Sequence, residues 1–96
     1  MKKNAVFVNV ARGAVVDEEA LCDAVLENRI AGVGIDVYST EPFGTDHPFN
    51  KIKDMDNVIL TPHIAWGAYE ARMRCLNEIK LNIESFFRGE ERNRIV

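Results

Sequence analysis

The first two thirds of the chain contain three short apolar segments, at Ala5–Val10, Gly32–Val37 and Asn57–Leu60. The first is dense in β-branched and aromatic residues and lacks the 3.6-residue period of a helix, which is typical of a strand buried on both faces. The two glycines of the second segment indicate close approach of another backbone or a helix. We therefore predict three β-strands.

Helical patterns lie between and after these strands. Asp17 can cap a first helix, and the acidic residues that follow suit the positive end of the helix dipole. Helical spacing then links Leu21, Ala24, Val25 and Asn28, of which the three apolar residues are predicted to face the sheet. Arg29 and Gly32 are plausible stop signals. A strand, a helix and a second strand in this order predict a parallel α/β sheet.

A long second helix is predicted from about residue 67 to residue 88, and Gly89 is a natural stop. Its apolar stripe comprises Leu76, Ile79, Ile83, Phe86 and Phe87. Residues 38–56 contain two prolines and a glycine and are predicted to be an irregular loop. A loop of this length is usually functional or poorly ordered.

Composition narrows the classes of protein that fit. With 96 residues, 47% hydrophobic and 28% charged, the chain is expected to be one globular domain or part of one. A net charge of −3 without a basic cluster argues against nucleic acid as a partner. No apolar run is long enough for a membrane span, and the start does not resemble a signal peptide. Cys22 and Cys75, outside any metal-binding spacing, are expected to be buried, reduced thiols of a cytoplasmic protein.

Arg12, Glu41 and His63 each come just after one of the predicted strands. The carboxyl ends of parallel strands open on one edge of a sheet, where ligands bind. An arginine can hold a carboxylate through two bonds, and a histidine carries protons near neutral pH. A glutamate bonded to a histidine raises the pKa of the histidine and fixes its tautomer. The three residues therefore predict a carboxylate clamp, a proton carrier and its tuning group.

Each of these residues also has a plainer interpretation. Arg12 fits a surface arginine in a turn, Glu41 an exposed turn residue, and His63 a partly buried histidine with local hydrogen bonds. Asp36 ends an apolar strand, where a charge needs a partner or a ligand. His47 is interpreted as a loop histidine without a functional role. Trp66 and Tyr69 are expected to pack in a core or a lid, with shielding of the site as the alternative for Trp66.

Three segments carry a resemblance that spans almost the whole chain. They are Phe7–Asp17, Ile30–Val37 with Thr40–Pro42, and Asn57–Ile64. In this order and spacing they resemble the C-terminal half of the nucleotide-binding domain of the D-isomer-specific 2-hydroxyacid dehydrogenases. The resemblance implies that residues 1–96 are part of a Rossmann-type domain of a two-domain enzyme. The Ala65-Trp66 pair and the DHPF sequence are most similar to the glycerate dehydrogenase (hydroxypyruvate reductase) branch.

The resemblance also implies roles for individual residues. In the family, the arginine of the NxxRG motif holds the substrate carboxylate, which points to Arg12. The TPH histidine exchanges a proton with the C2 oxygen, and the EP glutamate bonds that histidine, which points to His63 and Glu41. The aspartate that ends the second strand contacts the nicotinamide carboxamide, which points to Asp36. The implied cofactor-binding set is Val10, Ala11, Arg12, Asp36, His63 and Ala65.

The implied reaction is the reversible reduction of a 2-oxo acid by NADH, with NADP left open. The family's GxGxxG phosphate loop is not in the sequence, and Gly32 and Gly34 lie inside a strand. We therefore expect a fragment that is inactive alone, lacks the N-terminal part of the enzyme, and self-associates through uncovered surfaces. Two alternatives stay open: an NAD-sensing corepressor-like binding module, and a remnant without a function.

Overall fold

The computed structural model describes residues 1–95 and divides into two compact units, Met1–Ala65 and Trp66–Val96. The first unit contains the three strands, the first helix and the candidate site residues Arg12, Glu41 and His63. The second unit contains the long helix. Each unit is considered by itself below.

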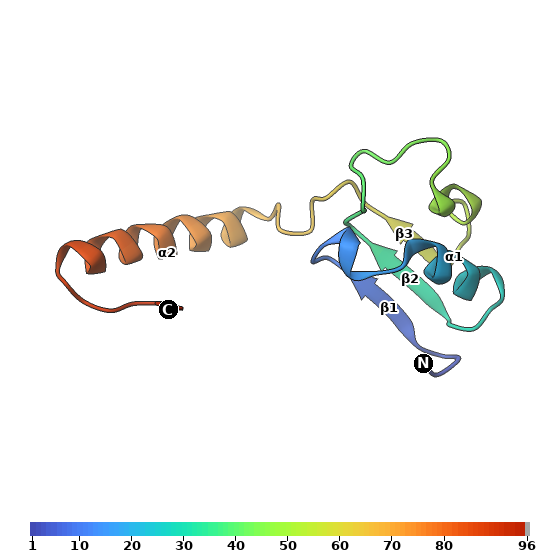
Figure 1. The fold of residues 1–96 in the computed structure, drawn as a ribbon, viewed down its shortest axis with the longest axis horizontal. Coiled ribbons are helices and arrows are strands. Elements are labelled where there is room, and N and C mark those ends of the chain that lie inside the picture. Colours follow the sequence, from blue (N-terminus) through green and yellow to red (C-terminus); the bar gives the residue numbers. More distant parts are fainter. Residues whose placement is uncertain (96) are drawn as a thin grey trace. The chain divides into compact units, whose positions relative to one another are not determined.

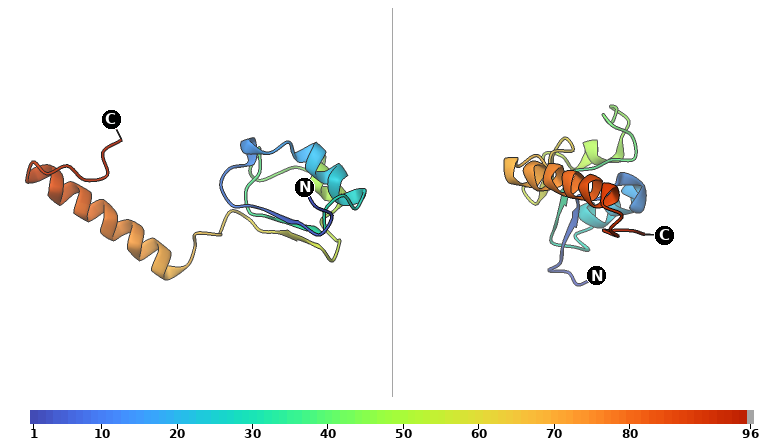
Figure 2. Two further views of the ribbon diagram at one scale, coloured as in Figure 1. Left: turned by 90° about the horizontal axis from the view of Figure 1, so that it is seen from below. Right: turned by 90° about the vertical axis from the view of Figure 1, so that its left-hand side faces the viewer.

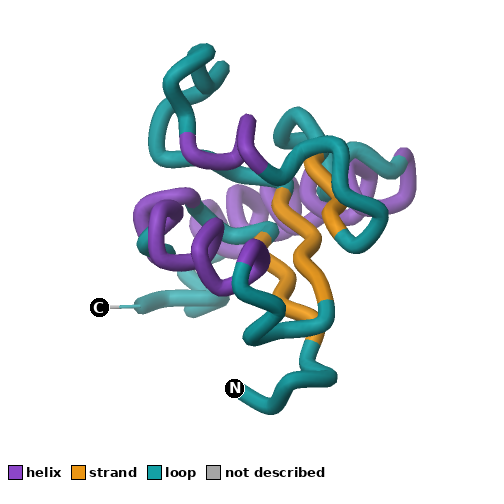
Figure 3. Tube along the Cα trace, turned by 90° about the vertical axis from the view of Figure 1, so that its right-hand side faces the viewer, coloured by secondary structure: helices purple, strands orange, loops and turns teal. Residues whose placement is uncertain are grey.

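The first unit is built on a parallel three-stranded sheet, which confirms the predicted architecture (Figures 1 and 3). The strands are β1 (Val6–Asn9), β2 (Gly32–Ile35) and β3 (Val58–Leu60), in the spatial order β1-β2-β3. Each is shorter than predicted: β1 lacks Ala5 and Val10, β2 ends at Ile35 instead of Val37, and β3 begins at Val58 instead of Asn57. The register aligns Phe7 with Val33, and Val33 with Val58.

Helix α1 (Glu18–Leu26) begins as the sequence predicts: the Asp17 side chain accepts a hydrogen bond from the Ala20 N–H. Its end is different. The helix stops before Arg29 because Asn28 adopts a left-handed backbone with φ of 54°. Asparagine tolerates this conformation better than most residues, and it commonly follows the last turn of a helix. The stop signal is therefore Asn28, which the helical spacing placed inside the helix.

One face of the sheet carries the hydrophobic core. The loop after β2 contains a short 3₁₀ helix, η2 (Pro48–Lys51), that packs against α1 on this side (Figure 2). Phe49 and Ile52 from this loop are fully buried with Val25 of α1 and Val33 of β2. The segment 38–56 is irregular as predicted, apart from Pro48–Lys51, and it contributes buried residues to the core.

The opposite face of the sheet is open. Val6, Val8 and Ile59 point away from the core, and Val8 and Ile59 are 62% and 66% exposed. The register places Gly34 between Val8 and Ile59, where it contributes no side chain. Parallel sheets are normally covered on both faces, so this face is an uncovered apolar surface.

The second unit contains helix α2 (Tyr69–Phe87), which ends before Gly89 at a positive φ of 72°. This confirms Gly89 as the stop. The predicted stripe is exposed in the structure, as are Trp66, Tyr69 and Cys75. The expected burial of Cys75 is therefore wrong, whereas Cys22 is buried as predicted. Packing of Trp66 and Tyr69 in a core or a lid stays a prediction. None of the helices in residues 1–95 combines the length and apolarity that a membrane span requires.

We expect the chain to self-associate through the uncovered sheet face, because burial of apolar area is favourable. A Val8→Thr/Ile59→Thr variant keeps the β-branched side chains that strands prefer but weakens this surface. It should lower the weight-average mass measured by light scattering at high protein concentration. The matched control is Val15→Thr, which changes an exposed valine outside the three strands. A monodisperse monomer for the unmodified chain would contradict the prediction.

Candidate active site at the carboxyl edge of the sheet

The ends of the three strands deliver Arg12, Glu41 and His63 to one edge of the sheet. Arg12 precedes the 3₁₀ helix η1 (Gly13–Val15) that follows β1. Glu41 lies in the loop after β2, and His63 lies three residues beyond β3. Glu41 and His63 are in direct contact, and the charge of Arg12 is close enough to act on the Glu41 carboxylate. The placement expected from the parallel-strand rule is therefore observed.

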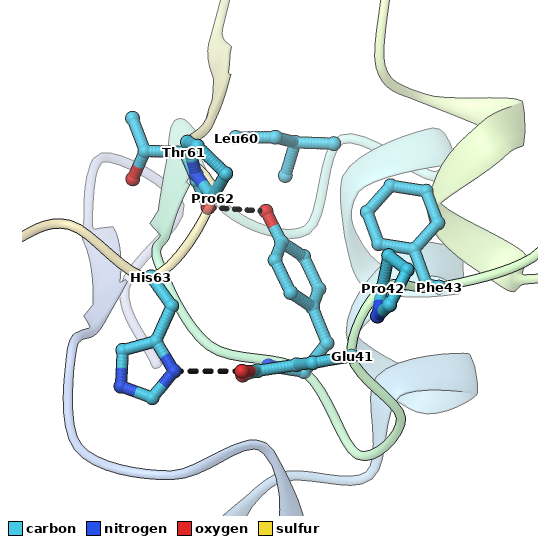
Figure 4. Close-up of a pocket in the computed structure, with 8 residues that line it drawn as sticks. Glu41, Pro42, Phe43, Leu60, Thr61, Pro62 and His63 are labelled. Carbon is cyan, nitrogen blue, oxygen red and sulfur yellow. Dashed lines mark hydrogen bonds and ion pairs between the residues drawn. The ribbon is translucent and has the colours of Figure 1, made fainter.

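Glu41 and His63 form a close charge-assisted pair, with 2.6 Å between Oε2 of Glu41 and Nδ1 of His63 (Figure 4). The other oxygen of Glu41 accepts the Tyr38 backbone N–H at 2.9 Å. This backbone bond first, and the His63 bond second, hold the pKa of Glu41 below its usual value, and Arg12 adds to the effect. The ionised carboxylate can only accept, so Nδ1–H donates. Nε2 is then the nitrogen available for proton exchange.

The backbone of His63 is held in an uncommon conformation. Its φ of 57° lies in the left-handed region, which residues other than glycine adopt infrequently. Residues in such conformations persist only where surrounding contacts fix them, and they cluster at functional sites. The turn that carries His63 therefore requires a specific support.

Asp36 provides that support from the end of β2. Its carboxylate accepts hydrogen bonds from the Thr61 hydroxyl (2.6 Å) and from the backbone N–H groups of Ile64 and Ala65 (both 2.8 Å). The residue is only 2% exposed. Burial alone would raise the pKa of Asp36, but these hydrogen bonds outweigh it, with help from His63, so that the pKa lies below its usual value. An ionised, fully bonded carboxylate thus fixes both sides of His63.

Asn9 organises the turn of Arg12 in a similar way. This buried residue at the end of β1 donates from its side-chain nitrogen to the Arg12 carbonyl at 2.9 Å and accepts the Ala11 N–H at 3.1 Å. The Arg12 guanidinium donates to the Ala11 carbonyl at 2.6 Å and is exposed. Asn9 was not among the predicted site residues, although a polar residue at the end of an apolar strand is a usable signal.

Gly13 brings the turn of Arg12 against the loop of Glu41. A Cβ atom at this position would lie 1.9 Å from the backbone carbon of Tyr38 and 2.2 Å from the Ser39 nitrogen. No side chain fits there, so the close approach of the two backbones requires glycine. This contact explains in physical terms why a glycine must follow Arg12.

A pocket of about 420 Å³ lies beside the His63–Glu41 pair. It is lined by Tyr38, Glu41, Pro42, Phe43, Leu60, Thr61, Pro62 and His63 (Figure 4). The Tyr38 hydroxyl donates to the Thr61 carbonyl at 2.9 Å, and burial raises the pKa of this phenol. The phenol therefore links the Glu41 loop to the His63 turn across the wall of the pocket.

The predicted cofactor-binding residues are distributed around the same edge. Val10, Ala11 and Ala65 are exposed next to the strand ends, whereas the carboxylate of Asp36 is occupied by the His63 turn. Their contacts with nicotinamide stay a prediction. Within residues 1–95, no group of three or more His, Cys, Asp or Glu side chains is arranged to hold a metal ion.

Comparison with known proteins identifies the family. Residues 1–65 match the D-isomer specific 2-hydroxyacid dehydrogenase NAD-binding domain, and the chain belongs to this family. The matched residues coincide with the first unit of the structure and contain Arg12, Glu41 and His63.

Individual relatives agree with this assignment. The chain is 44% identical over 90 residues to a glyoxylate reductase of Pyrococcus furiosus, with 94% of the chain and 26% of the relative covered. It is 39% identical over 93 residues to a glycerate dehydrogenase of Methylorubrum extorquens, with 97% and 29% covered. An acyclic imino acid reductase solved with NADPH and D-Arg superposes with a TM-score of 0.80 at 38% identity, covering 100% of the chain and 29% of that protein. The chain thus spans about a quarter of the length of these relatives.

We predict that Asp36→Asn destabilises the first unit, because an amide replaces one acceptor oxygen by a donor that faces N–H and O–H groups. The pKa of Asp36 is lower in the folded state than the usual value of about 3.9, so its contribution is present above that value and lost as the pH falls through the folded-state pKa. The loss in unfolding free energy should therefore be large at neutral pH and shrink below about pH 3.9.

Urea unfolding followed by circular dichroism at neutral pH and at acid pH measures this difference. Asp23→Asn is the matched control, since Asp23 is exposed on α1. A difference that is the same at both pH values, or equal to that of the control, would contradict the assignment of Asp36 as the support of the His63 turn.

Proposed function

We propose that the chain forms one wall of the active site of an NAD-dependent oxidoreductase that interconverts a small D-2-hydroxy acid and the corresponding 2-oxo acid. The observation that carries the proposal is the His63–Glu41 pair, in which Nδ1 is committed to the carboxylate and Nε2 is left for a substrate. The names of the two relatives support a small acid of the glyoxylate or hydroxypyruvate type as substrate.

The residues of the sheet edge fit the nicotinamide end of the cofactor. Val10, Ala11 and Ala65, which are exposed next to the strand ends, would line the nicotinamide ring, whether it belongs to NAD or NADP. Asp36, whose carboxylate is already hydrogen-bonded, would support them through the His63 turn that it holds. When bound, the cofactor supplies the hydride. The first turn of α1 is a poor pyrophosphate site, because Asp17 caps it and Glu18 and Glu19 make it acidic. A further polypeptide segment is therefore expected to provide the phosphate-binding loop and the opposite wall of the site.

The residues of this chain orient the substrate and move one proton. Arg12 binds the substrate carboxylate through its planar guanidinium, which places the carbonyl at C2 near His63. In the direction of reduction, the proton leaves Nε2 of His63 and bonds to the C2 oxygen. Glu41 holds Nδ1–H and stabilises the charge of the ring, so that the same nitrogen can take the proton back in the reverse direction.

We expect no turnover by the isolated 96-residue chain. Nicotinamide contacts alone should bind the cofactor weakly, since the described residues offer no cradle for the pyrophosphate. A steady-state assay of the purified chain with NADH or NADPH and hydroxypyruvate or glyoxylate, followed by absorbance at the nicotinamide band, measures this. Robust turnover by the chain alone would contradict the expectation.

A chimera tests the proposed function itself. The segment of the Pyrococcus furiosus glyoxylate reductase that aligns with this chain is replaced by the chain, which is 44% identical to it. We predict NADH- or NADPH-dependent reduction of glyoxylate or hydroxypyruvate. His63→Asn should lower kcat by about 10²- to 10⁴-fold, as loss of a general acid does. Arg12→Gln should raise KM by roughly tenfold or more, because hydrogen bonds to charged groups contribute about 1.5–3 kcal/mol.

The parent reductase and a chimera with Arg29→Gln serve as controls, since Arg29 is an exposed arginine outside the site. Circular dichroism and cofactor fluorescence establish that each variant is folded and binds cofactor. A folded, cofactor-binding chimera with no turnover, or one whose kcat is unchanged by His63→Asn, would refute the proposal.

A further inference from the structure

A second histidine–glutamate pair lies behind the site. Nε2 of His47 is 3.1 Å from Oε2 of Glu18, and their side chains are only 8% and 10% exposed. His47 was predicted to be a loop residue without a functional role, and Glu18 was not among the predicted site residues. A buried charged side chain requires several partners to offset its lost hydration. Glu18 has such partners: besides His47, it contacts Ser39 in the loop that carries Glu41.

The ring of His47 has a defined orientation. Nδ1 accepts the Phe49 backbone N–H at 3.2 Å, so that Nε2–H must donate to Glu18. The ring also stacks against Phe43, with 4.6 Å between centroids, and meets Phe49 edge-on at 5.0 Å. Because η2 and its aromatic neighbours fix the ring, His47 in turn fixes the carboxylate of Glu18.

Glu18 transmits this order to the loop of Glu41 through Ser39. Oε1 of Glu18 accepts the Ser39 backbone N–H at 2.9 Å, and Oε2 accepts the Ser39 hydroxyl. Ser39 lies between Tyr38, whose N–H binds Glu41, and Glu41 itself. The Glu18 carboxylate therefore fixes both the backbone and the side chain of Ser39.

We propose that Glu18 and His47 are positioning residues for proton transfer at His63. They act by holding Ser39 so that the Glu41 carboxylate meets Nδ1 of His63. Their effect on a reaction rests on the function proposed above, whereas their effect on the Glu41–His63 contact does not. Glu19, the next residue of the same helical turn, lacks this role: its side chain is 72% exposed and only approaches Lys51.

The test reads the state of His63 directly. The chain has two histidines, so long-range ¹H–¹⁵N spectra of the imidazoles resolve His63 and His47 without selective labelling. At a pH where the ring is neutral, the Glu41 bond selects the Nδ1–H tautomer of His63. Glu18→Gln replaces one acceptor by a donor facing Ser39 or His47. We expect loss of the Nδ1–H signature of His63 in this variant.

Glu19→Gln is the matched control and should leave the His63 spectrum unchanged, although it removes the same charge from the same turn. Ser39→Ala is the second variant. It removes one hydroxyl from the network, spares the buried Glu18–His47 pair, and should reduce the same signature. If Glu18→Gln does not fold, the Ser39→Ala variant tests the positioning role instead.

A His63 tautomer that is unchanged in a folded Glu18→Gln variant, or in Ser39→Ala when Glu18→Gln does not fold, would overturn the inference. So would an equal change in Glu19→Gln, because the effect would then be one of charge alone. The measurement needs neither cofactor nor turnover. An inactive chimera therefore refutes the proposed function without touching this result, and an unresponsive His63 in an active chimera refutes only the positioning role.

Discussion

The geometry of the site depends most on the buried carboxylate of Asp36. A charge with 2% exposure is tolerable only when it is fully hydrogen-bonded, and all of its partners lie in the segment Thr61–Ala65. The bonds to the Ile64 and Ala65 N–H groups fix the backbone immediately after His63, where the left-handed φ would otherwise be unfavourable. The buried charge at the end of β2 thereby supports the turn of His63, which follows β3.

A hydrogen-bonded polar side chain also holds each of the other two turns at this edge of the sheet. A buried Asn9 fixes the turn of Arg12, and the buried carboxylate of Glu18 holds the turn of Glu41 through Ser39. Each turn is thus tied by one polar side chain with several bonds. Because these bonds are directional, they determine where a side chain points more closely than apolar packing would. Contact between the backbones at Gly13 and Tyr38 then joins two of the three turns.

The sequence predicted the parts of this structure that depend on local patterns. The strands, the Asp17 cap and the delivery of Arg12, Glu41 and His63 to one edge follow from periodicity and from the rule for parallel sheets. The contacts of Asp36 and Glu18 were out of reach, because they join residues 21 to 29 positions apart, as in Glu18–Ser39 and Glu18–His47. The contacts of Asn9 are local, only two and three positions apart. The loop 38–56 is irregular apart from Pro48–Lys51, as predicted, but composition does not reveal that Phe49 and Ile52 anchor it in the core.

The position of the site within the first unit has a physical consequence. The uncovered face of the sheet, with Val8 and Ile59, exposes apolar area and weakens the unit as a whole. The turns of the edge, however, are held by the buried carboxylate of Asp36, by the core on the covered face and by the Glu18–His47 pair, none of which includes a residue of the open face. Covering that face should therefore increase stability more than it changes the geometry of Arg12, Glu41 and His63. Under the proposed function, these side chains would need little rearrangement to bind cofactor and substrate, because their orientation has already been fixed on folding.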